Sequence, residues 1–279
     1  MGIKLKTFAI ILDKPDAIYR TSDVISGQCI IGLDGKMQLD QLKIKLRGRA
    51  ECEWTEERQV TETNDEGETT TETVIDKFHN KDKHLKQEFC HQNGMYGKIE
   101  YYIKCRVKKS ALFSGDEKTT LPIEIISPAL PTSQDITSPV SKSNKKTVGL
   151  KVFGGKGLTL KADIARSGHN TGANIEVTCF MENKSKKAMT LKASLIESVL
   201  YTTKEGKKIS TDTISYAVGP NVEAKSVSTE TLSIQVPVTA LVLHNTCPII
   251  SATHELDVYL DISGSFDLHC NLPVVITNF

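Results

Sequence analysis

Two runs of alternating basic residues are the part of this sequence whose chemistry is easiest to define. No acid interrupts either row of cations: Lys43, Lys45, Arg47 and Arg49 form one row, and Lys104, Arg106 and Lys108 form the other. Alternate side chains of an extended strand lie on one face about 6.6 Å apart, so each row is a line of like charge. Such a line favours an anionic partner: phosphorylated tails, an acidic peptide or lipid headgroups. The alternative is an ordinary solvated sheet face that keeps the protein soluble.

Other reactive residue types do not form a recognisable catalytic or metal-binding pattern. The spacing of one histidine- and cysteine-containing group fits no zinc signature: His79, His84, Cys90 and His91. The segment Gly154–Gly157 lacks the spacing of a phosphate-binding loop and instead predicts a hairpin turn before a strand at Leu158. We find no Gly-x-Ser-x-Gly motif. The sequence therefore predicts a protein that is not an enzyme and needs no cofactor or metal.

The cysteines predict buried, reduced thiols. Seven are present, an odd number, and no pair is spaced as Cys-x-x-Cys: Cys29, Cys52, Cys90, Cys105, Cys179, Cys247 and Cys270. The first apolar run, Phe8 to Leu12, is too short for a signal peptide, and Lys6 stands where a myristoylation motif needs Ser or Thr. These features favour a cytosolic protein. The single Trp54 ends an apolar strand face, which favours core packing over ligand stacking.

Length and charge narrow the class of protein further. The chain has 279 residues, about right for two domains, and no apolar stretch approaches the roughly 20 residues of a membrane span. Its 35 basic and 34 acidic residues give a net charge of +1, which argues against a dedicated nucleic-acid binder.

Period-two alternation dominates the chain and predicts strands without helices. The predicted strands are Ile25–Ile31, Leu42–Trp54, Ile99–Val107, Leu158–Ile164, Ile175–Met181 and Leu256–Leu260. The acidic stretch from Glu56 to Asp76 predicts a solvated loop or hairpin tip. Strands without intervening helices indicate an all-β fold of antiparallel sheets, in a sandwich or a barrel.

An internal repeat divides the chain into two similar halves. Landmarks recur about 150 residues apart, on the same kind of strand: Ile25 with Ile175, Cys29 with Cys179, Leu42 with Leu191, Leu46 with Leu195, Ile103 with Leu256, and Leu121 with Leu272. A Pro-, Ser- and Thr-rich segment without alternation separates the halves. We therefore expect one domain over residues 1–127, a linker over 128–147 and a second domain over 148–279.

The two halves differ by one strand. The second half has a strand from Leu232 to Val238, and nothing between Phe78 and Ile99 corresponds to it. Only Leu85, Phe89 and Cys90 are available there to replace it. We therefore expect the first lobe to be the less stable of the two and the more prone to edge pairing with another chain.

The ordered set of landmarks resembles a known family. Arg20–Gly27, Leu42–Gly48, Trp54–Glu56 and Gly97–Ile103 are similar to the amino-terminal arrestin domain of the alpha-arrestins, or arrestin-domain-containing proteins. Four segments of the second half are similar to the carboxy-terminal arrestin domain: Gly168–Ile175, Glu182–Ser185, Val258–Gly264 and Leu272–Ile276. The resemblance covers nearly the whole chain and implies two tandem arrestin-like, immunoglobulin-like β-sandwiches.

The chain departs from this family pattern in two places. The family's Phe-x-Phe-x-x-Pro-type strand before the Gly97 segment is missing, so either the first sandwich has an open edge or the sequence is a shortened product. There is also no Pro-Pro dipeptide, whereas many alpha-arrestins carry Pro-Pro-x-Tyr motifs that bind ubiquitin ligases of the HECT type.

The resemblance implies a non-catalytic cytosolic adaptor. Such a protein binds receptors or transporters, acts in their endocytic sorting, and lies peripherally at the plasma membrane and endosomes. Two alternatives remain open: a retromer-type scaffold of a coat complex, and a catalytic protein, which would need a convergent polar cluster that the sequence does not display.

Overall fold

The computed structural model consists of β-strands. It describes residues 5–20, 23–35, 39–63, 69–83, 92–109, 116–126, 136–148, 156–243 and 247–278, and every regular element in these ranges is a strand. The chain forms two compact units. The first contains Met1–Pro128, Leu200–Lys208 and Asn245–Ser251, and the second contains the remainder.

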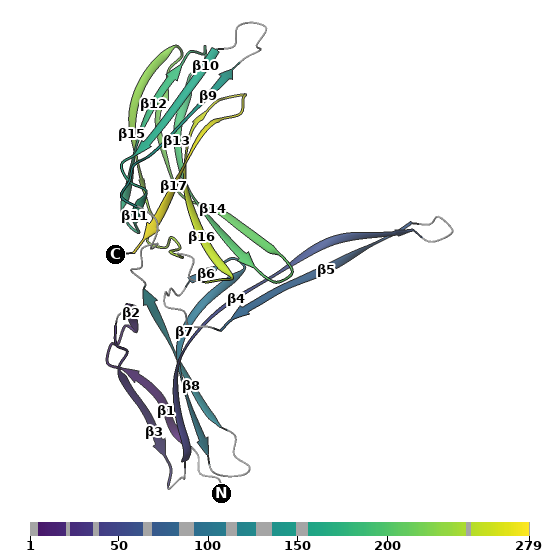
Figure 1. The fold of residues 1–279 in the computed structure, drawn as a ribbon, viewed down its shortest axis with the longest axis vertical. Coiled ribbons are helices and arrows are strands. Elements are labelled where there is room, and N and C mark those ends of the chain that lie inside the picture. Colours follow the sequence, from purple (N-terminus) through teal and green to yellow (C-terminus); the bar gives the residue numbers. More distant parts are fainter. Residues whose placement is uncertain are drawn as a thin grey trace. The chain divides into compact units, whose positions relative to one another are not determined.

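The first half of the chain forms a large sheet and a small one (Figure 1). The large sheet has the order β2 (Ile18–Arg20), β8 (Glu117–Ile126), β7 (Gly97–Lys109), β4 (Leu39–Thr63) and β5 (Thr69–Asp82), with β6 (Gln92–Gly94) also paired to β7. The small sheet pairs β1 (Leu5–Leu12) with β3 (Gly27–Leu33). Burial raises the pKa of Cys105 on β7 to about 11, and the neighbouring thiol of Cys29 on β3 contributes to this rise, so the two sheets face one another.

The second half forms two sheets of more equal size. One has the order β15 (Ser226–Gln235), β12 (Asn174–Asn183), β10 (Lys156–Ile164) and β9 (Val140–Val148). The other has the order β11 (Gly168–Asn170), β17 (Leu268–Thr277), β16 (Ile250–Asp261), β13 (Met189–Thr202) and β14 (Lys207–Val222). One continuous core of aliphatic side chains fills the space between them. This is the all-β, tandem-sandwich architecture that the sequence predicts.

The strand pairings confirm the internal repeat. Ile103 lies opposite Leu121 in the first half, and their repeat equivalents Leu256 and Leu272 lie opposite each other in the second. Both halves also contain a three-residue parallel strand, β2 beside β8 and β11 beside β17, which the expectation of purely antiparallel sheets missed. The equivalence places β1 and β3 with β10 and β12, and β4 and β5 with β13 and β14.

One part of the expected linker is a strand. Residues 140–147, which the sequence analysis places in a linker over 128–147, form β9 together with Val148 and pair antiparallel with β10. β9 is an edge strand whose polar side chains, such as Lys142 and Lys145, are exposed. Its backbone hydrogen bonds to β10 do not depend on side-chain type, so the strand forms without apolar alternation. That the first domain ends at residue 127 and the second begins at residue 148 stays a prediction.

The alternating strand from Leu42 to Trp54 is real but only half of its apolar face is buried. Ala50, Cys52 and Trp54 are buried in β4, whereas the same face near the start of the strand is open to solvent. Leu42, Ile44 and Leu46 are 44%, 55% and 38% exposed, while their equivalents Leu191, Ala193 and Leu195 are fully buried. The physical cause is the width of the facing sheet, which has two described strands in the first half and four in the second.

The acidic stretch lies in a long hairpin of β4 and β5. The two strands stay paired from Ala50 opposite Asp82 out to Thr63 opposite Thr69. At the base of the hairpin Trp54 is buried and stacks on Phe78, with ring centroids 5.1 Å apart. Trp54 is therefore a core residue, as the sequence indicates.

The strand predicted at Leu232–Val238 is β15, which the structure places at Ser226–Gln235. Leu85, Phe89 and Cys90, the side chains that could replace it in the first half, lie outside the described residues. Among the residues that the structure does describe, β3 has no neighbour on the side where β12 has β15.

Candidate anion-binding groove

Strand pairing brings the two predicted basic rows side by side. In the pairing of β4 with β7, Lys43 lies opposite Arg106 and Lys45 lies opposite Lys104. The next pairing, of β7 with β8, places Lys118 opposite Arg106. Like charges directly opposite each other on one sheet face destabilise the sheet, because the Cβ atoms of directly opposite residues lie about 5 Å apart. The sequence therefore folds into a surface that concentrates positive charge across three strands.

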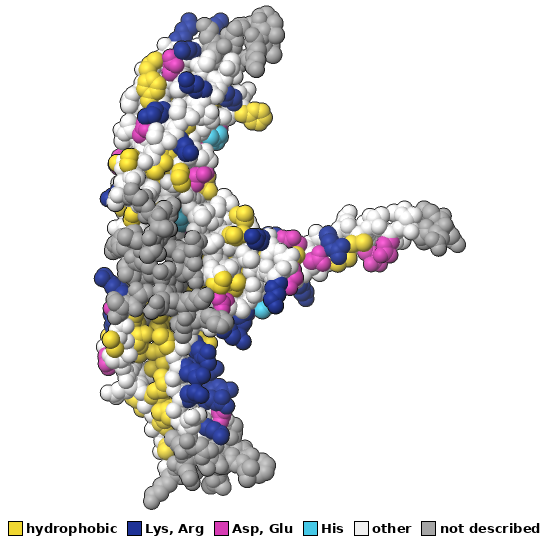
Figure 2. Space-filling model, in the orientation of Figure 1, with side chains coloured by type: hydrophobic (Ala, Val, Ile, Leu, Met, Phe, Trp, Pro, Cys, Tyr) yellow, Lys and Arg dark blue, Asp and Glu magenta, His cyan; other side chains and the backbone are white. Residues whose placement is uncertain are grey.

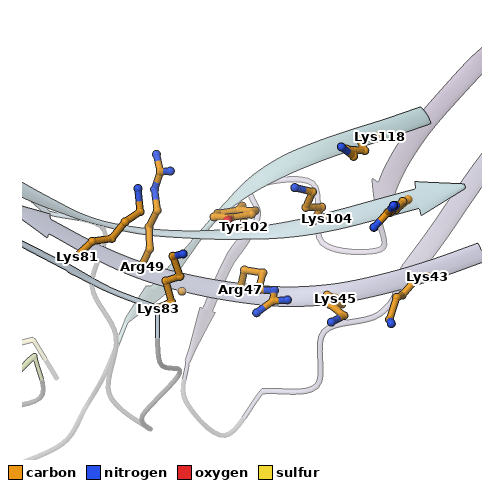
Figure 3. Close-up of a pocket in the computed structure, with 11 residues that line it drawn as sticks. Lys43, Lys45, Arg47, Arg49, Lys81, Lys83, Tyr102, Lys104 and Lys118 are labelled. Atoms are coloured by element: carbon orange, nitrogen blue, oxygen red, sulfur yellow. The ribbon is translucent and has the colours of Figure 1, made fainter. Parts of the chain in front are cut away.

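These side chains line a groove of about 500 Å³ (Figure 3). We call it the basic groove and define it by Lys43, Lys45, Arg47, Gly48, Arg49, Lys81, Lys83, Tyr102, Lys104, Arg106 and Lys118. The residues come from β4, β7 and β8, from β5, and from the position directly after β5. Nine of these eleven residues are Lys or Arg, so the groove offers many donors and no carboxylate of its own.

Acidic neighbours neutralise part of this charge. Arg49 forms an ion pair with Glu100 at 2.6 Å, Lys81 pairs with Glu51 at 3.1 Å, and Arg106 pairs with Asp116. Burial opposes ionisation of Glu100, but hydrogen bonds from Lys98 and Arg49 outweigh it and lower its pKa. These paired cations are held in place by their acidic partners.

Four other cations of the groove are not neutralised in this way. Among the described residues, no acidic side chain pairs with Lys43, Lys45, Arg47 or Lys104. The neighbouring charges of Lys43 and Arg47 lower the pKa of Lys45, since each disfavours a further positive charge beside it. A bound anion would relieve this repulsion, so the groove is suited to phosphate or carboxylate groups.

Six of the seven basic residues singled out in the sequence line the groove. The seventh, Lys108, is exposed on β7 opposite Gln41 and lies outside the lining. Sequence reasoning missed Lys81, Lys83 and Lys118, which only the pairing of β5 and β8 with their neighbours brings to the same face. The alternating positions of Lys81 and Lys83 are a pattern in the sequence from which these two residues could have been found. That the groove binds an anion stays a prediction.

The histidine- and cysteine-containing group does not come together in what the structure describes. His79 Nε2 lies 3.2 Å from Oε1 of Glu51 and contributes to lowering the pKa of that carboxyl group. His84, Cys90 and His91 lie outside the described residues, as do Gly154 and Gly155. Within the described ranges there is no group of three or more His, Cys, Asp or Glu side chains placed to hold a metal ion.

Four of the six cysteines that the structure describes are buried in the sandwiches. Cys52, Cys105, Cys179 and Cys270 are buried, whereas Cys29 is only half-buried although it lies on the same strand face as its equivalent Cys179. Burial raises the pKa of Cys179 to about 12. Cys29 is less buried than Cys179 because, among the described residues, the two sheets of the first half cover less of each other than those of the second half.

Fold and site together define a class of protein: a two-lobed β-sandwich molecule with a basic groove on its first lobe and no described catalytic cluster. Comparison with known families identifies it further. Residues 8–91 match the model of the arrestin (or S-antigen) N-terminal domain, and residues 155–279 match that of the arrestin (or S-antigen) C-terminal domain. The chain belongs to the arrestin family, and its relatives are alpha-arrestins.

Two curated relatives show the extent of the similarity. Arrestin domain-containing protein 4 of Homo sapiens is 25% identical over 185 residues, which cover 66% of this chain and 43% of the relative. Thioredoxin-interacting protein of Homo sapiens is 21% identical over 298 residues, which cover 98% of this chain and 74% of the relative. The chain thus spans less than half of the first relative and about three quarters of the second.

Arrestin-family proteins are generally non-catalytic adaptors that bind receptors and other adaptors. In the described part of the chain, no helix is long and apolar enough to cross a membrane.

Proposed function

We propose that this protein is a cytosolic, non-catalytic adaptor for membrane cargo. It binds cytoplasmic segments of receptors or transporters and acts in their endocytic sorting, peripherally at the plasma membrane and endosomes. Membership of the arrestin family supports the adaptor role. The sandwiches act as rigid frames that present grooves and strand edges to extended segments of other proteins.

The basic groove is the observation on which the cargo proposal rests. Four of its cations lie in rows without acidic partners among the described residues, so a phosphorylated or acidic segment along β4 and β7 replaces repulsion by charge-assisted hydrogen bonds. Arg47 can bind an anionic group with two parallel donors, whereas the lysines act as point charges. Arg49 already donates to Glu100. A linear segment fits better than a single ion because the cations extend over several residues of each strand.

The test is binding of the full chain to a phosphorylated peptide and to its unphosphorylated form. The double variant Lys43→Glu with Arg47→Glu removes two cations of the groove that have no acidic partner among the described residues. A hydrogen bond to a charged group contributes about 1.5–3 kcal/mol, so loss of two should weaken phosphopeptide binding at least about tenfold. Binding by the unchanged protein should also weaken as salt rises, because exposed charges are screened within about 8 Å at physiological ionic strength.

A matched control changes charge equally elsewhere. Lys142→Glu with Lys186→Glu alters two exposed lysines of the second unit and should leave binding unchanged. Equal loss in both double variants, or salt-insensitive binding, would rule the groove out. If the protein binds vesicles containing phosphatidylserine but not the phosphopeptide, the ligand of the groove is a lipid headgroup and not a cargo segment.

Two further elements of the proposal need cellular tests. Recruitment of a HECT-type ubiquitin ligase has no Pro-Pro-x-Tyr motif in this sequence to support it and needs its own test. Proximity labelling in cells should recover membrane receptors or transporters. Stoichiometric purification with one soluble partner would instead favour the alternative of a scaffold in a coat complex of the retromer type.

A further inference from the structure

As far as the structure describes the first lobe, its small sheet has fewer strands than its counterpart in the second lobe. In the second half, β12 is paired on one side with β10 and on the other with β15 over ten residues. Its equivalent β3 pairs with β1, and among the described residues nothing pairs with the other side of β3. The backbone N–H and C=O groups along that side of β3 are therefore a template for a further strand.

The second lobe shows what a strand at this position covers. Leu232, Ile234 and Val236 of and after β15 are buried in the core. A Cβ added at Gly219 would lie 2.7 Å from a methyl group of Leu232 and 3.3 Å from one of Leu191, so Leu232 lies close to Leu191 beneath it. β15 thus covers the start of β13 and the neighbouring part of β14.

The first lobe lacks this cover at the equivalent residues. Leu42, the equivalent of Leu191, is exposed together with Ile44 and Leu46 on the same face of β4. Figure 2 shows hydrophobic side chains at the surface of the first lobe, next to the cluster of Lys and Arg side chains. A row of three large aliphatic side chains on one strand face is typical of a surface that another element covers.

The free side of β3 also lacks the features that normally protect a sheet edge. Gly27 to Leu33 contains no charged residue and no proline. β9, an edge strand of the second lobe, contains three lysines, Lys142, Lys145 and Lys146. Charged edge strands prevent pairing with other chains, and β3 carries no such charge.

We propose that the free edge of β3 binds an extended segment of another protein, which pairs with β3 as β15 pairs with β12. The alternate side chains of the bound segment are Leu, Ile or Val and cover Leu42, Ile44 and Leu46, while its main chain hydrogen-bonds to β3. This mode of recognition is strand addition, in which backbone pairing supplies affinity and the inward side chains supply specificity. The site is separate from the basic groove, whose cations alternate with this apolar row on β4.

A single strand fits this position better than a second copy of the chain. A strand added to β3 lies above β4 and β5, as β15 lies above β13 and β14. The β3 strand of a second copy would bring its own β4 and β7 beneath it, and these would need the space that β4 and β5 of the first copy occupy. The bound partner is therefore an extended segment that is not already part of a sheet of its own.

The second lobe supplies the probe for the test. A fluorescent synthetic peptide with the sequence of Ser226 to Val236 should bind the full chain saturably, with added protection of the β3 amides from hydrogen exchange. A control peptide with Leu232→Asn, Ile234→Asn and Val236→Asn should not bind, because its inward side chains are polar. Protection at β12 instead of β3 would mean that the probe displaces β15, and the proposal would be wrong.

Two matched variants test the apolar row. Ile44→Asp places a carboxylate under the bound strand, whereas Ile75→Asp changes an isoleucine of the same lobe with nearly the same exposure, 55% against 56%. Because both positions are exposed, both variants should fold. We expect Ile44→Asp to weaken peptide binding at least tenfold and Ile75→Asp to change it less than twofold.

Three results would overturn the proposal. The first is no saturable binding at millimolar peptide, and the second is equal binding by the two isoleucine variants. The third is full protection of the β3 amides without peptide. If that protection rises with protein concentration, a second copy occupies the edge, and if it does not, the chain covers its own edge.

Discussion

At the scale of single residues, Lys45 shows how the fold places cations so close together that they repel one another and favour a bound anion. It lies between Lys43 and Arg47 on one strand face and opposite Lys104 on the next strand. Its side chain is exposed, so the lowered pKa comes from neighbouring cations first and from burial least. The protonated form of Lys45 is thus less favourable in the folded protein than in the unfolded chain.

This sign leads to a prediction about Lys45 itself. A bound phosphopeptide stabilises the ammonium form, so the pKa of Lys45 should rise on binding, and binding should weaken as pH rises through that pKa. The measurement is an NMR titration of the lysine side-chain signals with and without peptide, with Lys142 as an unaffected control. Lys45→Gln should leave the fold at least as stable, because it removes a repelled charge. An unchanged pKa would show that the anion binds elsewhere.

The cysteines make a second prediction at this scale. Burial raises the pKa of the Cys179 thiol to about 12, so almost no thiolate exists near neutral pH and the native protein should react very slowly at this residue. Among the cysteines that the structure describes, half-buried Cys29 and Cys247 should react before the buried ones, as mass spectrometry after brief alkylation would reveal. The melting temperature should be the same with and without reductant. A disulfide in freshly prepared protein would contradict the assignment of reduced core cysteines.

At the scale of elements, β4 contributes one face to the core and the other to the basic groove, and Gly48 lies where the two requirements meet. A methyl group at Gly48 would overlap the ring of Tyr101, coming within 2.7 Å of its Cδ1 atom. Tyr101 is itself buried, so the ring has little room to move. The glycine is therefore needed for close packing and not for an unusual backbone angle.

Gly48→Ala should destabilise the first lobe by about 1–3 kcal/mol, the usual cost of overpacking a core. Gly157→Ala, in strand β10, is the matched control. Nothing lies within 4 Å of its added carbon, so the loss of unfolded-state entropy should leave stability unchanged or slightly higher. Chemical unfolding of both variants measures the difference. Equal stabilities would mean that Tyr101 moves aside at no cost.

At the scale of the whole molecule, the two lobes have unequal cores. Between the sheets of the second lobe the side chains are almost all buried, whereas the apolar row of β4 in the first lobe is open. Fully burying a Leu or Ile side chain contributes about 1.5–3 kcal/mol, which is large against a typical domain stability of about 5–15 kcal/mol. The lobe with less burial should therefore be the less stable one.

Denaturant unfolding of the full chain tests this inequality. Trp54 is the only tryptophan and is buried in the first lobe, so its fluorescence reports that lobe, while far-UV circular dichroism reports both. We expect dichroism to show two transitions and the fluorescence change to coincide with the first of them, at the lower denaturant concentration. The strand-donor peptide of Ser226 to Val236 should move only the fluorescence transition, and to higher denaturant. Coincident transitions would contradict the prediction that the first lobe is weaker.

Local patterns in the sequence determined the strands, the repeat and the family. Alternation at Leu42–Trp54 and the landmarks about 150 residues apart depend on side chains close together in the chain, and the strand pairings bear them out. The basic row of β4 was visible for the same reason. Strand β9 was missed because a polar edge strand is held by backbone hydrogen bonds, which leave no alternation in its side chains.

Only the tertiary structure decided which of these faces meet. The addition of Lys81, Lys83 and Lys118 to the groove depends on strand pairing, which joins segments far apart in the sequence. Whether an apolar row is buried depends on the width of the sheet that faces it. Leu42 and Leu191 have the same residue type on equivalent strands, but only Leu191 is covered, because β15 exists above it and no described strand lies above Leu42. Alternation reports that a strand has an apolar face, and a neighbouring element decides whether that face leaves water.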